Sequence, residues 1–209
     1  MSVEHRVWMV RRAAWKRALD LVVGGAALII LSPVMAVLVI LIRLDSPGPA
    51  IFKQQRVGLG GTMFSMWKFR SMFVGNDDQT HRDAAAAWFA AAAVAASYKV
   101  ENDPRITRTG RFLRRFSLDE LPQLFNVMRG DMSLVGPRPA IEYELSLYER
   151  WYFDRFRVPP GMTGLWQVSG RDRTSAPAMM KLDVEYANHS SLATDLGVLL
   201  RTIPVVLGR

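Results

Sequence analysis

The hydrophobic residues of this chain form one long uninterrupted run near its start and shorter, patterned runs after it. Residues 21–42, LVVGGAALIILSPVMAVLVILI, carry no charge over 22 positions. As a helix this segment would be roughly 33 Å long, enough to cross the hydrocarbon core of a bilayer. A helix that is apolar on every face favours membrane insertion over burial in a soluble core. A cleaved signal peptide is the alternative, but the run is long for one and no small-x-small cleavage site follows it.

Ser32 and Pro33 interrupt this run at its middle. Proline removes a backbone hydrogen bond and kinks a helix. Basic residues flank both ends of the run, whereas a simple span usually carries its positive charge on one side. We therefore predict a re-entrant helix that enters the membrane, turns back at Ser32–Pro33 and keeps both of its ends cytoplasmic. The flanking residues are Arg11, Arg12, Lys16 and Arg17 before the run, and Arg43, Lys53 and Arg56 after it.

Alternating patterns follow the apolar run. Residues 51–58 and 63–72, IFKQQRVG and MFSMWKFRSM, are β-prone and are joined by Leu-Gly-Gly, which predicts a β-hairpin. Lys68 and Arg70 alternate with Trp67 and Phe69, so that one face of the second strand is cationic and the other can be buried. A cationic face suits phosphate binding, although a solvated strand face is an equal alternative.

Most of the remaining patterns are helical. Residues 83–100 are alanine-rich with high helix propensity. Residues 191–209, SLATDLGVLLRTIPVVLGR, are apolar but too short and too broken by Pro204 to span a membrane. They predict either a core helix or a helix on the membrane surface. The patterns together indicate an α+β fold that is mainly helical.

Composition narrows the chemistry. The formal net charge is +8, and 22 of the 27 basic residues are arginine, which binds phosphate and carboxylate through paired hydrogen bonds. Nucleic acid, anionic lipid and a phosphorylated small substrate all fit this bias. The chain has no cysteine, which excludes disulfides, thiol nucleophiles and cysteine-based zinc sites. Its three histidines show no metal-ligand spacing.

An acidic pair stands out in residues 116–126, FSLDELPQLFN. Ser117 and Glu120 fit a capping box at a helix start, a purely structural interpretation. Pro122 opposes it, because proline at the fifth helical position clashes with the carbonyl of Leu118. Asp119 and Glu120 are therefore candidates for chemistry as well as for capping.

Positive charge surrounds this pair in the sequence. If residues 105–115 are helical, Arg108, Arg111 and Arg115 fall within about 60° of one another on one helix face. Nearby cations lower a carboxylate pKa, so we expect both acids to be ionised. A solvated or lipid-facing basic helix is the alternative interpretation.

Two glycine- and proline-rich loops follow. In residues 129–139, RGDMSLVGPRP, Arg138 lies between two prolines and so has few backbone states to lose on binding an anion. In residues 159–171, PPGMTGLWQVSGR, the glycines allow close approach to a ligand and Trp166 could stack on a base. Each loop alone is a weak signal.

These features permit phosphoryl transfer at a membrane surface. Two ionised carboxylates can hold Mg²⁺, which prefers oxygen ligands and substrate phosphates. With the phosphoryl oxygens neutralised, a carboxylate can attack phosphorus and form an acyl phosphate. The membrane helix would bring such a site to a lipid phosphate as second substrate.

The order of these motifs resembles that of the bacterial sugar transferases known as monotopic phosphoglycosyl transferases. The resemblance runs from about Lys16 to the C-terminus. It is most specific in residues 103–139, DPRITRTGRFLRRFSLDELPQLFNVMRGDMSLVGPRP. The chain resembles the minimal catalytic form of the family, without the extra transmembrane bundle of longer relatives.

The resemblance implies transfer of a sugar-1-phosphate from a UDP-sugar to undecaprenyl phosphate, with Mg²⁺ as cofactor. It places residues 1–45 as a basic lead-in and re-entrant membrane helix, and residues 46–209 as a cytoplasmic catalytic domain with interfacial helices. The expected location is the cytoplasmic face of the bacterial inner membrane, in contact with membrane lipids and downstream glycosyltransferases. Nucleic acid is not an expected partner, and a homodimer is left open.

The resemblance also implies residue roles. Asp119 would be the nucleophile that becomes linked to the phospho-sugar while UMP leaves, and Glu120 would assist with the metal and the acceptor. Both acids are the expected metal ligands, and Ser32 with Pro33 is the re-entrant break. The candidate substrate- and phosphate-binding residues are Arg114, Arg138, Lys68, Arg70, Gly136, Pro137, Gln167 and Arg171.

The chain departs from the family pattern at two places. Pro159 stands where the family usually has a basic residue, and Arg157 is the nearby arginine. The stretch ANHSSLATDL lacks a tryptophan often found there. Asp183 matches a family position, but its role does not follow from the sequence, and no residue identifies the sugar.

Two rival interpretations are carried forward. In the first, the lipid phosphate attacks the donor directly in a ternary complex. In the second, the chain is a basic membrane-anchored adaptor without catalysis, which would need no acidic pair beside a restrained arginine.

Overall fold

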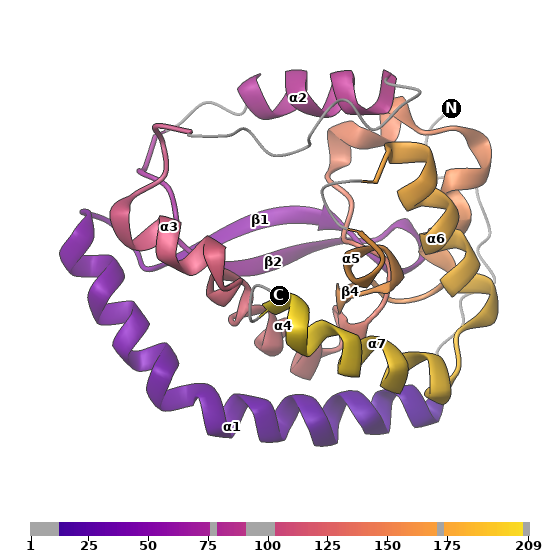
Figure 1. Cartoon of the computed structure of the whole chain (residues 1–209), viewed down its shortest axis with the longest axis horizontal. Helices are drawn as coiled ribbons and strands as arrows, with labels where there is room; N and C mark the ends of the chain where they lie inside the picture. Colours follow the sequence, from indigo (N-terminus) through magenta and orange to yellow (C-terminus); the bar gives the residue numbers. More distant parts are fainter. Residues whose placement is uncertain (1–12, 76–78, 91–102, 171–173, 207–209) are drawn as a thin grey trace.

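The chain folds around a long helix and a two-stranded hairpin. The computed structural model describes residues 13–75, 79–90, 103–170 and 174–206. Helix α1 runs along one side of the molecule and the β1–β2 hairpin crosses the middle, with α7 drawn between the hairpin and α1 and α6 at the right of the view (Figure 1). The mainly helical architecture with a short antiparallel sheet confirms the predicted class. The elements in order are α1 (Ala14–Asp45), β1 (Ile51–Val57), η2 (Leu59–Gly61), β2 (Met63–Phe69), α2 (Gln79–Ala90), α3 (Arg108–Arg115), η3 (Leu118–Glu120), α4 (Gln123–Arg129), β3 (Ser133–Val135), η4 (Glu142–Leu147), η5 (Arg150–Arg157), β4 (Gly161–Thr163), α5 (Leu165–Val168), α6 (Ala176–His189) and α7 (Leu192–Val206).

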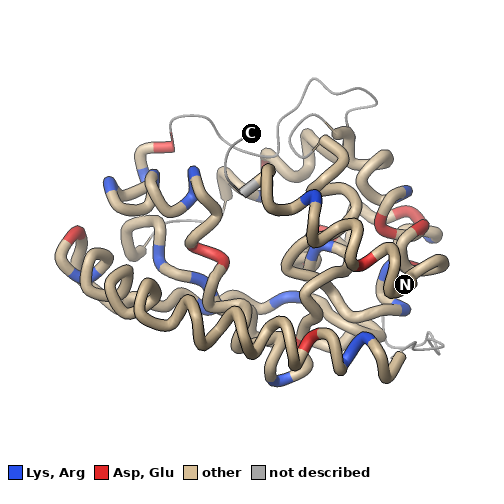
Figure 2. Tube along the Cα trace, turned by 60° about the horizontal axis from the view of Figure 1, so that its bottom comes forward, with Lys and Arg blue, Asp and Glu red and all other residues tan. Residues whose placement is uncertain are grey.

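Helix α1 contains the apolar run. It is long and apolar enough to cross a membrane, with a mean hydropathy of 2.8 in its most apolar window, of which only 17% is buried. The middle of the helix carries no charged residue (Figure 2). The helix continues through Pro33 and bends along its length (Figure 1). Ser32 Oγ donates to the carbonyl of Ile29 near this proline.

The first turns of α1 are fixed to the rest of the chain by buried polar contacts. Lys16 is 5% exposed, and its Nζ donates to Tyr186 Oη of α6 at 2.8 Å and forms an ion pair with Asp195 of α7. The guanidinium of Arg17 donates to the carbonyls of Val127 and Met128 at the C-terminal end of α4. A cation at this end of a helix interacts favourably with the helix dipole. Helix α1 is therefore part of the folded body at its N-terminal end.

The hairpin forms as predicted. Strands β1 and β2 pair antiparallel, with Ile51 opposite Phe69 and Val57 opposite Met63. A second, small sheet that the sequence did not predict joins β3 and β4 in parallel. Gly161 lies at this junction, where a Cβ atom would come within 2.0 Å of the backbone nitrogen of Gly136.

One side of helix α7 packs in the core, as the first of its two predicted environments requires. Its Asp195 and Val198 are buried, and Val198 packs into the main core with Val127 and Tyr186. The opposite side of the helix exposes apolar side chains at helical spacing. These are Leu192, Leu196, Leu200 and Ile203.

The alanine-rich helix is described in part. Helix α2 begins at Gln79 and extends to Ala90, whereas the rest of the predicted segment, residues 91–100, lies outside the described residues. Trp88 and Phe89 pack it against Tyr152 and Met180 of the C-terminal half.

Candidate active site

The acidic pair lies in a strained turn between two helices. Helix α3 ends at Arg115, Ser117 adopts a left-handed conformation with φ 54°, and η3 then carries Asp119 and Glu120. Among the described residues Ser117 is the one non-glycine residue with positive φ. Backbone strain of this kind is commonly retained at functional sites.

The predicted capping box does not form. A Ser117 N-cap would need extended backbone geometry, but its left-handed conformation leaves its side chain without a cap hydrogen bond. Pro122 is the N-cap of a new helix, α4, so the proline starts a helix instead of interrupting one. The acids thus lie on a short separate turn.

Lys68 of the hairpin reaches this turn. Its Nζ forms an ion pair with Glu120 Oε1 at 3.1 Å, with both side chains partly exposed. Asn126 of α4 aligns the two elements, because its Oδ1 accepts from the backbone N–H of Trp67 at 2.9 Å and its Nδ2 donates to the carbonyl of Ser65. This bridging amide is a site-positioning residue that the sequence analysis missed.

Asp119 is more deeply placed, with 9% of its surface exposed. Burial raises the pKa of Asp119, the charge of Lys68 opposes that rise, Glu120 adds to it and Arg114 opposes it. Nearby cations lower this pKa as expected, but loss of hydration outweighs their attraction, so the expectation of a lowered pKa for Asp119 was wrong. In the described part of the chain, the Asp119 carboxylate forms no ion pair and accepts from its own backbone N–H.

Arg114 is held beside the acids by the end of the hairpin. Its Nε donates to Ser71 Oγ at 2.9 Å. Helix α3 packs directly on the same segment, since a Cβ atom on Gly110 would lie 2.0 Å from the Ser71 carbonyl oxygen. The three arginines predicted on one face of this helix, Arg108, Arg111 and Arg115, are all exposed.

Arg138 belongs to a second cluster of charges at the other end of β1. The Arg138 loop contacts this end because Val57 bridges to Ala140 and Arg56 donates to the carbonyl of Pro139. Nη1 of Arg138 lies 3.2 Å from both carboxylate oxygens of Glu144. The hairpin thus connects the acidic turn to the arginine loop.

Comparison with known proteins shows the family of this chain. The family described as bacterial sugar transferase matches residues 11–209. The chain belongs to the bacterial sugar transferase family. It is 45% identical to the undecaprenyl-phosphate galactose phosphotransferase of Salmonella typhimurium, over 93% of this chain and 40% of the relative. It is 39% identical to the exopolysaccharide production protein ExoY of Rhizobium meliloti, over 91% of this chain and 84% of the relative.

A third relative differs in the sugar it is named for. The UDP-glucose:undecaprenyl-phosphate glucose-1-phosphate transferase of Caulobacter vibrioides is 40% identical over 92% of this chain and 69% of the relative. The chain spans about two fifths of the length of several relatives, including the Salmonella protein. Relatives named for galactose and for glucose match with similar identity, so identity alone does not indicate the sugar.

A divalent cation fits the acidic turn of this chain by donor chemistry. Asp119 and Glu120 offer carboxylate oxygens, and the described residues contain no group of three His, Asp or Glu side chains that could hold a metal. Mg²⁺ is commonly held by one or two carboxylates together with substrate phosphates and water. A cation here would also stabilise the ionised form of an acid whose pKa burial raises.

The structure separates the other predicted binding residues. Arg70 is 5% exposed, and its Nη2 donates to the Ser46 carbonyl at 2.6 Å at the end of α1, a position that favours a structural role. Gly136 and Pro137 are buried in the loop before Arg138. Gln167 lies on the short helix α5, where its Oε1 is buried without a hydrogen-bond partner among the described residues. Arg171 lies outside the described residues.

The structure shows the surroundings of one departure from the family pattern, Pro159 with the nearby Arg157, and those of Asp183. Pro159 is buried with its carbonyl oxygen against Gly136, and Arg157 forms a surface ion pair with Asp154 at 3.3 Å. Asp183 is buried in an ion pair with Arg155. Neither Arg155 nor Glu144 was predicted from the sequence. Arg155 pairs with Asp183, 28 positions along the chain, which no local pattern indicates.

Proposed function

We propose that this chain transfers a sugar-1-phosphate from a UDP-sugar to undecaprenyl phosphate through a covalent intermediate on Asp119. The observation that carries the proposal is the Asp119 carboxylate, which is buried beside the cationic Lys68 and Arg114 and forms no ion pair of its own in the described structure. The printed names of the Salmonella and Caulobacter relatives support the reaction class.

The first half-reaction uses Asp119 as a nucleophile. Its carboxylate oxygen forms a bond to the phosphorus that carries the sugar, the bond from that phosphorus to the bridging oxygen breaks, and UMP leaves with the bridging oxygen. Lys68 and Arg114 face the charge that develops on the phosphoryl oxygens. Burial favours attack because a poorly hydrated carboxylate keeps its charge available to the phosphorus.

The second half-reaction restores the acid. A phosphate oxygen of undecaprenyl phosphate attacks the same phosphorus, and the bond from phosphorus to Asp119 breaks to release the lipid-linked sugar. Glu120 lies next to the nucleophile and is proposed to assist the acceptor. When bound at Asp119 and Glu120, Mg²⁺ would supply neutralisation of the phosphoryl oxygens.

The membrane arrangement of the proposal rests on α1 and α7. We propose that α1 is re-entrant at Ser32–Pro33 and that the exposed apolar side of α7 lies at the interface, on the cytoplasmic face of the inner membrane. The uncharged, exposed surface of α1 and the spacing of Leu192, Leu196 and Leu200 support it. A homodimer and use of the product by downstream glycosyltransferases remain predictions.

A UMP-release assay tests the proposal. The full chain in detergent or nanodiscs receives undecaprenyl phosphate, Mg²⁺ and, in separate reactions, a panel of UDP-sugars. UMP release that requires a UDP-sugar is expected, and its absence with every sugar would leave the adaptor interpretation. Mass spectrometry of protein mixed with donor alone then separates the mechanisms, because a phospho-sugar on Asp119 is expected and a ternary-complex mechanism forms none.

A further inference from the structure

A second ion pair lies deeper than the acidic turn. Arg155 of η5 and Asp183 of α6 are each 1% exposed, and Arg155 Nη2 donates to Asp183 Oδ2. Removing two charges from water is costly, and a buried pair is by itself weak support for stability. The remaining hydrogen bonds of the pair therefore indicate its role.

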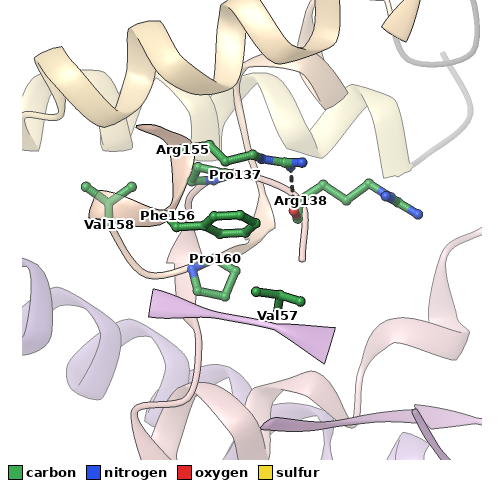
Figure 3. A pocket seen from close by; sticks show the side chains of 7 residues that line it. All are labelled: Val57, Pro137, Arg138, Arg155, Phe156, Val158 and Pro160. Atoms are coloured by element: carbon green, nitrogen blue, oxygen red, sulfur yellow. Dashed lines mark hydrogen bonds between the residues drawn. The ribbon is translucent and has the colours of Figure 1, made fainter. Parts of the chain in front are cut away.

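Those hydrogen bonds converge on the backbone of Arg138. Arg155 Nη2 donates to the Arg138 carbonyl at 2.6 Å, shown as a dashed line in Figure 3. The Asp183 carboxylate accepts from the backbone N–H of the same residue. Tyr148 Oη accepts from Arg155 Nη1 at 2.6 Å and fixes the guanidinium from its other side. One buried ion pair thus satisfies both backbone polar groups of one loop residue.

The side chain of Arg138 points away from the Arg155–Asp183 ion pair. In Figure 3 it extends away from Arg155 and from the apolar residues around Phe156. Its Nη1 meets Glu144, which is fully buried and also accepts from the backbone N–H of Ile141 at 3.1 Å. Two arginines and two carboxylates therefore form a cluster with no net formal charge, in which Arg138 is the member nearest to solvent.

The two flanking prolines alone do not fix the orientation of the Arg138 side chain. Pro137 and Pro139 restrict the backbone to extended geometry, but the loop between β3 and η4 has no helix or sheet of its own around them. An arginine on such a loop loses freedom on binding an anion, which weakens binding unless the loop is already ordered. Hydrogen bonds to its N–H and C=O provide that order.

We propose that Arg155 and Asp183 are a positioning pair that fixes the backbone of Arg138 and so aims its guanidinium at a phosphate group of the donor. The inference rests on the proposed function in that it takes Arg138 as an anion-binding residue. It assigns a role to Arg155 and to Asp183, whose role does not follow from the sequence. Neither Arg155 nor Asp183 is proposed to touch substrate.

The test compares two buried aspartates. Asp183→Asn removes the charge beside Arg138, whereas Asp195→Asn removes an equally buried charge that pairs with Lys16. We expect Asp183→Asn to raise KM for the UDP-sugar about tenfold and to weaken UDP binding by calorimetry to a similar extent. Asp195→Asn should lower the melting temperature comparably while KM stays within about twofold. Equal KM effects in the two variants would overturn the proposal.

A double-mutant cycle shows whether the effect passes through Arg138. Arg138→Lys removes the paired donors of the guanidinium, so Asp183→Asn should have little further effect on KM in that background. Additive effects would mean that Asp183 acts elsewhere and would overturn the inference. If Asp183→Asn does not fold, Tyr148→Phe replaces it in the cycle, with an expected rise in KM of about threefold and the same loss of coupling.

Calorimetry of UDP binding distinguishes a failure of the proposed function from a failure of the positioning pair. If the wild-type chain binds UDP but releases no UMP from any donor, the proposed function fails, while selective weakening of UDP binding by Asp183→Asn still supports the positioning pair. If the wild type releases UMP and Asp183→Asn binds UDP as tightly as wild type, the positioning pair fails and the proposed function stands.

Discussion

Two buried aspartates of this chain have opposite surroundings. Asp183 is held by direct contact with Arg155 and by a backbone N–H, whereas Asp119 has cations nearby but no ion pair within the described structure. Burial raises the pKa of both carboxyl groups, that of Asp183 to about 6. The contact with Arg155 favours the ionised form of Asp183 and pairs its carboxylate.

The difference separates an acid that holds the fold together from one that is available to react. A paired carboxylate has its oxygens occupied, so attack on phosphorus would require breaking a buried ion pair. Asp119 retains its oxygens for a substrate, and nearby Lys68 ion-pairs with Glu120 instead. Substitution of each aspartate should consequently affect different properties.

Asp119→Asn should have the largest effect on activity. The amide is nearly the same shape but cannot form the phospho-sugar bond, so UMP release should fall by roughly a thousandfold or more. The melting temperature should stay the same or rise, because the substitution removes a charge that burial disfavours. Near-normal turnover would exclude Asp119 as the nucleophile.

Asp183→Asn should show the reverse pattern in stability. It leaves Arg155 buried without its counter-charge, which should lower the free energy of unfolding by about 3–5 kcal/mol in urea titrations. If Asp119→Asn destabilises the chain as much as Asp183→Asn, the contrast between the two aspartates does not hold.

The surroundings of Asp119 could be predicted from the sequence better than those of Asp183. The acidic pair, the hairpin that carries Lys68 and the apolar helix were all visible because their residues are close in sequence or follow a simple period. The Arg155–Asp183 contact joins residues 28 positions apart across two helices, and its acceptor, the Arg138 carbonyl, is backbone. No side-chain pattern indicates such contacts.

Two local patterns did not indicate the tertiary contacts that their residues make. The Ser117-x-x-Glu120 spacing fits a capping box, but the turn places Ser117 in a left-handed conformation and Glu120 on Lys68. Arg70 follows the alternation of β2, yet its guanidinium satisfies carbonyl groups at the end of α1, an element far away in sequence. In both cases a tertiary contact replaced the local interpretation.

Removing Lys68 should sharpen the contrast, because it changes the surroundings of the acidic pair and leaves those of Asp183 as they are. Its charge opposes the rise in the pKa of Asp119, so Lys68→Gln should raise that pKa further. Because the nucleophile must be ionised, the acid limb of the kcat/KM profile should move to higher pH, with a loss of about a hundredfold at neutral pH.

Lys53→Gln is the matched control for this prediction. Lys53 is an exposed lysine on the neighbouring strand whose Nζ lies over the Trp67 ring at 4.9 Å. Its replacement should leave the acid limb in place. A similar shift in both variants would indicate a general effect of surface charge.

The smallest expected effect concerns the backbone that carries Asp119. The left-handed conformation of Ser117 disfavours any residue with a Cβ atom, so Ser117→Gly should be more stable than Ser117→Ala by about 1 kcal/mol in urea titrations. Both variants lose the hydroxyl group, so the difference isolates the strain. The Arg138 backbone, by contrast, is extended by its prolines and fixed by side chains, so it needs no left-handed residue. Equal stability of the two variants would show that the acidic turn relaxes when Ser117 is replaced, and the strained geometry would then not be a fixed property of the site.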